Sequence, residues 1–102
     1  MQGSEKQIAW AEDIMAKVKH WVTRMESGLD SDNVSDDERA IVQGVIDKVK
    51  SDILTMTDAK AIIDNRDKVT QFDKAVEIML NKAGHSGQRV LADIDAQANR
   101  KS

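Results

Sequence analysis

The sequence has no cysteine, no proline and no tyrosine, and it has only five glycines and three aromatic residues among its 102. Without cysteine the chain can form neither a disulfide framework nor a thiolate metal site, and we expect a reducing, cytoplasmic setting. Because glycine and proline mark the turns of β hairpins, their scarcity disfavours a β sandwich or barrel. The composition therefore favours helices around a core of aliphatic residues and methionine.

An excess of basic charge and a long apolar run are also missing. Fifteen lysines and arginines stand against 18 acids, for a net charge of −3, which argues against nucleic-acid binding driven mainly by charge. No apolar run is long enough to cross a membrane, and the N-terminus shows no basic segment followed by an apolar stretch. We therefore expect no membrane partner and no secretory signal.

Hydrophobic residues recur at helical spacing through the first half of the chain. Ser4 and Gln7 form a capping-box pattern that predicts the start of a helix, and Gly28 is placed to end it in the left-handed conformation. A second capping box over residues 35–38 predicts another helix, in which Gly44 would let a neighbour approach closely. Intervals of three and four predict the buried stripe of the first helix: Ile8, Ala11, Ile14, Met15, Val18, Trp21, Val22 and Met25.

The second half of the chain predicts shorter helices. A short helix over residues 59–63 is followed by a break near residues 64–67. Gly84 is placed to end the next helix, and Ser86 to cap a last one over residues 88–99. The helix between the break and Gly84 has a predicted buried stripe of Val69, Phe72, Val76, Met79, Leu80 and Ala83.

No repeat or composition shift divides the chain. The pattern predicts one all-α domain over residues 1–102, an irregular bundle of four or five short helices. Residues 1–3 and 100–102 are expected to fray.

None of the motifs that could carry chemistry matches its template in full. The acidic run 30–38 resembles a calcium loop, but Val34, Ser35 and Ile41 stand where an EF-hand needs an oxygen ligand, glycine and glutamate. The run Gly84-His85-Ser86-Gly87 is one residue short of a nucleophile elbow and lacks the preceding strand. The two histidines do not have the paired spacing of a helical zinc site. We therefore predict no enzyme, no cofactor and no metal site.

An acidic segment is the first candidate for a binding surface. Five acids around the start of the second helix would present a dense negative surface to a basic groove on a partner protein: Asp30, Asp32, Asp36, Asp37 and Glu38. Trp10, as a partly exposed apolar anchor, and Arg66, in a polar turn, are further candidates for contact with that partner. The alternative for each is an ordinary solvated face.

A basic face on the first helix is the second candidate. Lys17, His20 and Arg24, together with Lys6, would share one stripe that could contact phosphates. On this interpretation the chain is a nucleic-acid-binding accessory or regulatory protein, acting alone or as a homodimer.

Two blocks of the sequence, GSEKQIAWAEDI at residues 3–14 and DAKAIIDNRD at residues 58–67, cover about a fifth of the chain. They resemble blocks in small helical proteins of bacteria, phages and plasmids. The resemblance carries no catalytic signature and leaves activity open, but it implies a mobile-element setting. There, small acidic proteins often bind and inhibit host factors, as anti-CRISPR proteins do. Our leading hypothesis is an interaction protein that inhibits a host nucleic-acid-handling protein such as a CRISPR effector.

Overall fold

The computed structural model describes residues 2–69 and 71–101, and the expected all-α fold is confirmed for them, because they contain helices and no strand. Helix α1, with 24 residues, has the bounds predicted from Ser4 and Gly28, and α2 has 17 residues, while the described residues form six helices where we expected four or five. None of the helices in the described ranges combines the length and the apolar character of a membrane span. In chain order the helices are α1 (Glu5–Gly28), α2 (Asp36–Asp52), α3 (Ala59–Asp64), α4 (Arg66–Val69), α5 (Phe72–Lys82) and α6 (Gly87–Lys101).

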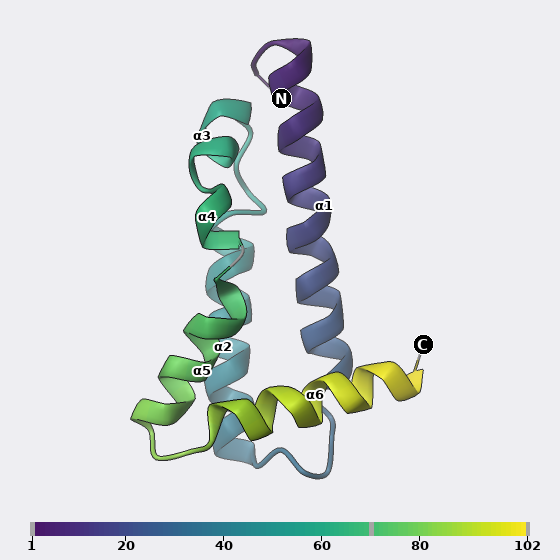
Figure 1. The fold of residues 1–102 in the computed structure, drawn as a ribbon, viewed down its shortest axis with the longest axis vertical. Coiled ribbons are helices and arrows are strands. Elements are labelled where there is room, and N and C mark those ends of the chain that lie inside the picture. The colour runs from purple at the N-terminus through teal and green to yellow at the C-terminus, as the bar shows by residue number, and fades with distance from the viewer. Residues whose placement is uncertain (1, 70, 102) are drawn as a thin grey trace.

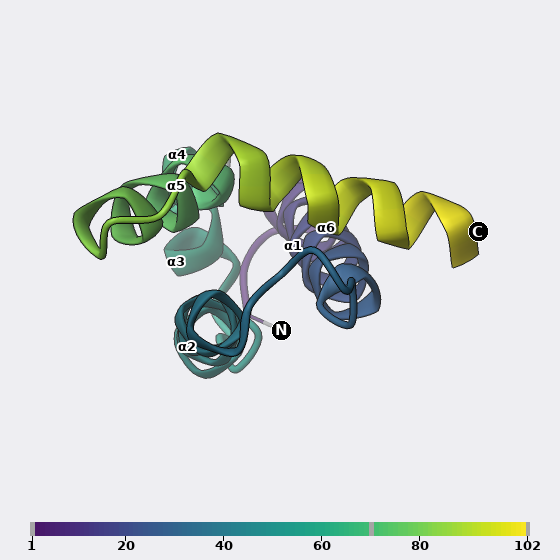
Figure 2. The ribbon, with the colours of Figure 1, turned by 90° about the horizontal axis from the view of Figure 1, so that it is seen from below.

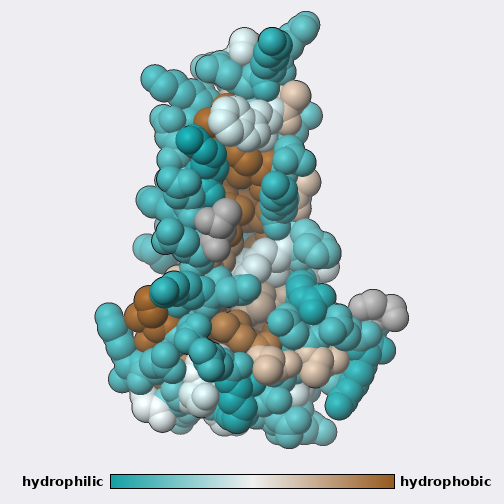
Figure 3. Space-filling view, viewed as in Figure 1, coloured by the Kyte–Doolittle hydropathy of each residue, from teal (hydrophilic) through white to brown (hydrophobic). Residues whose placement is uncertain are grey.

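The helices form two upright columns that are crossed at one end. Figure 1 shows α1 as one column and the succession of α3, α4 and α5, with α2 behind, as the other. Helix α6 crosses the lower end and packs against both α1 and α5, and the view from below places it on the opposite side from α2 (Figure 2). In the space-filling view, apolar side chains follow the seam between the columns and appear again over α5 (Figure 3).

The core lies between these columns and follows the predicted stripes closely. In α1 the expected stripe is buried, with only Ile8 and Trp21 partly exposed. Each large aliphatic side chain withdrawn from water contributes about 1.5–3 kcal/mol to folding. The largest fully buried side chains are Ile46, Ile62, Leu80 and Ile94, which come from four different helices.

Both predicted capping boxes are present. The Ser4 hydroxyl accepts a bond from the Gln7 amide while the Gln7 side chain accepts one from the Ser4 amide, and Ser35 and Glu38 make the same reciprocal pair. Near the chain ends, where we expected fraying, the described residues are held. Gln2 forms an isolated bridge with Asp58, and α6 continues to Lys101. Met1 and Ser102 lie outside the described residues.

Two glycines have roles other than those we predicted. Gly28 is the last residue of α1 and has no positive φ; a Cβ there would lie 2.0 Å from the carbonyl oxygen of Ile94. It is therefore the point where α6 crosses α1. Gly44, expected at a close approach, has nothing within 4 Å of its Cβ position and is exposed. Gly84 ends α5 with φ +87, as predicted.

The expected break near residues 64–67 is present. Helix α3 ends at Asp64, and the Asn65 side chain donates a hydrogen bond of 2.7 Å to the carbonyl of Ala61. A second interruption separates α4 from α5, so the predicted stripe is divided between two helices. Two members of that stripe, Met79 and Ala83, are exposed rather than buried, because α5 is apolar over a wider arc than its neighbours cover.

Candidate functional site

Glu38 is the buried centre of a polar network, not part of an exposed acidic surface. Its side chain is only 4% exposed. One carboxylate oxygen accepts from the Ser35 amide at 2.9 Å. The other lies 2.6 Å from an Arg89 guanidinium nitrogen and 2.9 Å from Nδ1 of His85. Glu38 therefore does not contribute to the exposed acidic surface that we expected.

The hydrogen bond from the Ser35 backbone, together with the guanidinium of Arg89, lowers the pKa of Glu38 to about 2 although burial acts in the opposite direction. Arg89 belongs to α6 and also donates to the carbonyl of Asn33 and to Asp93. The network therefore joins the start of α2 to the start of α6, and its role is to hold the fold.

The remaining four acids are exposed, and two of them pair with basic side chains. Asp30 pairs with Lys101 at 2.6 Å, and this bond lowers its pKa. Asp36 pairs with Arg39 at 2.7 Å. Asp32 and Asp37 are exposed. Because two of these four acids have basic partners, the expected negative surface is partly neutralised.

The connection that carries these acids also differs from a solvated loop. Leu29, Ser31 and Val34 are buried. The Arg39 side chain donates to the backbone carbonyls of all three, at 2.7, 3.4 and 3.2 Å respectively. The loop is therefore ordered by the arginine of the following helix.

The predicted basic face is also partly neutralised. Lys17 lies 3.6 Å from Asp13, and Arg24 pairs with Asp95 at 2.9 Å. His20 and Arg24 line a small hollow of about 190 Å³ together with Lys101. Because Arg24 and Lys101 already have acidic partners, the hollow offers little free positive charge to a phosphate.

Trp10 and Arg66, predicted separately, are brought together by the fold. The guanidinium carbon of Arg66 lies 5.2 Å from the centroid of the Trp10 ring, a cation–π contact. Trp10 is 49% exposed. It lies near the start of α1, at the end of the molecule away from α6 (Figure 1), so it does not share a surface with the acids. Trp21, by contrast, donates to Asp73 at 2.7 Å and packs on Phe72.

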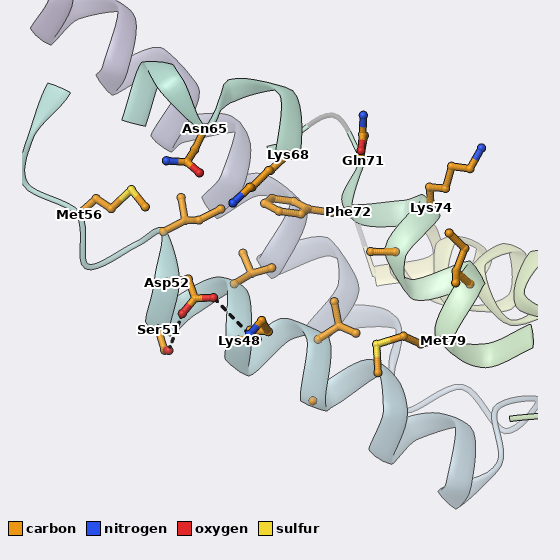
Figure 4. A pocket seen from close by; sticks show the side chains of 16 residues that line it. Lys48, Ser51, Asp52, Met56, Asn65, Lys68, Gln71, Phe72, Lys74 and Met79 are labelled. Atoms are coloured by element: carbon orange, nitrogen blue, oxygen red, sulfur yellow. Dashed lines mark hydrogen bonds and ion pairs between the residues drawn. The ribbon is translucent and has the colours of Figure 1, made fainter. Parts of the chain in front are cut away.

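A further candidate surface, which we did not predict, is an apolar hollow between α2 and α5. It has a volume of about 980 Å³, and we call it the α2–α5 groove. Its wall on α2 includes Val45 and Val49, with Ile53 just beyond the end of that helix, and its wall on α5 includes Phe72 and Ala75. Figure 4 shows Met56 at one end of the groove and Met79 at the other.

The rim of this groove carries more positive than negative charge. Its lining includes three lysines, Lys48, Lys68 and Lys74, and one acid, Asp52. Lys48 is bound to Asp52 at 3.7 Å. Neither Lys68 nor Lys74 forms an ion pair with another residue of the described ranges. Lys68 extends over the groove beside Phe72, whereas Lys74 points outward (Figure 4).

The groove was missed because we assigned the apolar residues of α5 to a single buried stripe. Ile78 and Met79 are 43% and 50% exposed, and with Ala75 they have the spacing of a second apolar stripe on the same helix. When a helix is apolar on two faces, the second face either packs against another element or stays exposed. The second apolar face of α5 is the signal in the sequence that points to the groove.

Within the ranges that the structure describes, no three His, Asp or Glu side chains gather in a way that could hold a metal ion. Comparisons of the chain with protein-family models, with curated proteins and with solved structures give no match.

Proposed function

We propose that this chain is a non-enzymatic interaction protein that binds a partner protein through the α2–α5 groove. The observation that carries the proposal is the exposure of Ile78 and Met79 beside a concave apolar surface. Contiguous exposed apolar surface next to a hollow is typical of binding sites, because covering it removes apolar area from water. Ionic pairing within the chain makes the acidic and basic surfaces less suitable.

The proposal keeps the class of function that the sequence suggested and changes the surface. An inhibitor of a host nucleic-acid-handling protein, such as a CRISPR effector, needs one surface that recognises its target. The groove supplies a candidate for that surface. The identity of the target and the mobile-element setting stay predictions that rest on the resemblance alone.

Replacing Met79 with aspartate is expected to lower the amount of partner bound by at least about tenfold, because a charge would be placed within an apolar contact. Met79 is half exposed in the free protein, so the variant should keep its helicity. The measurement is capture of partner from a lysate of the organism that encodes the chain, with circular dichroism of each variant as a check on folding.

Two further variants separate the candidate surfaces. Trp10→Asp removes an apolar side chain of nearly the same exposure, 49%, at a distance from the groove. The triple variant Asp32→Asn, Asp36→Asn, Asp37→Asn neutralises three exposed acids and keeps Asp30, whose ion pair with Lys101 joins the loop to α6. Both should capture partner as the wild type does. Loss of capture in either one, with Met79→Asp unaffected, would assign binding to that other surface and remove the proposal.

A further inference from the structure

We infer that the α2–α5 groove accepts a single amphipathic helix of a partner protein, about ten residues long, with acidic residues along its flank. This inference rests on the proposed function and specifies the binding element. Three features support it: the length of the groove, the hydrogen bonds that already occupy the backbone groups of its walls, and the positive charge on its rim.

The length of the groove matches a short helix. Along α2 and its C-terminal cap the lining runs from Gly44 to Ile53, nine residues apart, and at 1.5 Å per residue this corresponds to about 14 Å. Along α5 the lining runs from Phe72 to Met79, or about 10 Å. A helix of about ten residues spans this distance with apolar side chains at positions i, i+3 or i+4, and i+7.

The backbone chemistry of the groove favours a helix over an extended segment. The two longest walls are helices, whose amides and carbonyls are already paired along their own length. An extended peptide laid over them would place its own amides and carbonyls against apolar side chains without partners, which costs free energy at each group. A helix satisfies its own backbone, so it can present an apolar face to the groove without that penalty.

The side chains at the ends of the groove fit an apolar helix face. Met56 and Met79 lie at opposite ends (Figure 4), and methionine adapts to the shape of what it contacts because it is unbranched and polarisable. Gly44 leaves open space at the groove wall, with no atom within 4 Å of its Cβ position. The incoming helix can therefore approach α2 closely at that point.

The positive charge on the rim favours a partner helix that carries acidic residues along its flank. Lys68 and Lys74 lack acidic partners among the described residues, although the chain as a whole has a net charge of −3. Opposite charge across an interface favours binding over distances within about 10 Å at ordinary salt. A second copy of this chain is a poorer occupant, because a two-fold contact at the groove would bring the same lysines of both copies together.

The test uses three labelled peptides of about 14 residues. One has a three- or four-residue apolar spacing flanked by glutamates, the second has lysines in place of the glutamates, and the third is a scramble of the first without an apolar face. Fluorescence anisotropy with the full-length protein at about 50 mM salt measures binding. We expect the acidic amphipathic peptide to bind at least about tenfold more tightly than either of the others. The difference in affinity between the acidic and the basic peptide should become smaller at about 0.5 M salt.

Charge reversal on the protein gives the matched comparison. The double variant Lys68→Glu, Lys74→Glu should reverse the preference between the acidic and basic peptides. The control Lys6→Glu, Lys19→Glu makes the same change in net charge at two exposed lysines of α1 that do not line the groove, and it should leave the preference unchanged.

Several results would overturn the inference. If the basic peptide or the scrambled peptide binds as tightly as the acidic one, the groove does not recognise an acidic amphipathic helix. A dimer in sedimentation velocity that Met79→Asp dissociates would also overturn the inference, because a second copy would then be the occupant. If Met79→Asp abolishes partner capture while the acidic peptide fails to bind, only this inference fails. If Met79→Asp leaves capture intact, the proposed function itself fails.

Discussion

Replacing Gly28 with alanine is expected to lower the free energy of unfolding by about 3 kcal/mol, an unusually large effect for the addition of one methyl group. The added Cβ would lie 2.0 Å from the carbonyl oxygen of Ile94 and 2.7 Å from its carbonyl carbon. Backbone atoms of a helix cannot move aside as a flexible side chain can, so α6 must shift away from α1. Urea unfolding followed by circular dichroism measures the loss, and the melting temperature should fall by about 15 °C.

Gly44→Ala is the matched control, because it makes the same chemical change in another helix of the same chain. No atom lies within 4 Å of the Cβ position of Gly44. Alanine should therefore raise the free energy of unfolding by about 0.5–1 kcal/mol through its better helix propensity. A Gly28→Ala variant as stable as the wild type would show that α1 and α6 do not cross as closely as the structure has them.

These two glycines show what could be predicted from the sequence. Helix starts were predicted correctly because a capping box is local: Ser4 and Gln7, or Ser35 and Glu38, satisfy each other's amides within one turn. The glycine roles were predicted wrongly because they depend on which helix passes nearby. Nothing within α1 indicates that Ile94 lies against Gly28.

The same contrast between local patterns and distant contacts explains why the sequence pointed to the acids and not to the groove. The acids of residues 30–38 looked like a surface because the basic side chains that pair with them, Arg89 and Lys101, come from the far end of the chain. The groove was hidden for a related reason. Its two walls are separate helices, and only the packing of α2 beside α5 turns their leftover apolar residues into one concave surface. The amount of apolar surface was visible in the sequence, but its shape was not.

Replacing Glu38 with glutamine should make the protein less stable at neutral pH and should remove one part of its acid sensitivity. Folding lowers the pKa of Glu38 from 4.5 to about 2. A carboxyl whose pKa falls on folding contributes stability that is fully present above the unfolded pKa and is lost as the pH falls through the folded one. Each pKa unit corresponds to about 1.4 kcal/mol, so the contribution at neutral pH is about 3 kcal/mol.

Glutamine keeps the capping box, because its side-chain oxygen can still accept the bond from the Ser35 amide, and it places an uncharged NH2 donor where Glu38 accepts from Arg89 and His85. The wild type should therefore exceed Glu38→Gln by about 3 kcal/mol at pH 7, and the two unfolding free energies should converge between pH 4.5 and pH 2. Asp37→Asn, an exposed neighbour in the same helical turn, should change stability by no more than about 0.5 kcal/mol at pH 7. A difference between the wild type and Glu38→Gln that stays constant down to pH 2 would show that shape, and not the charge facing Arg89 and His85, holds α2 to α6.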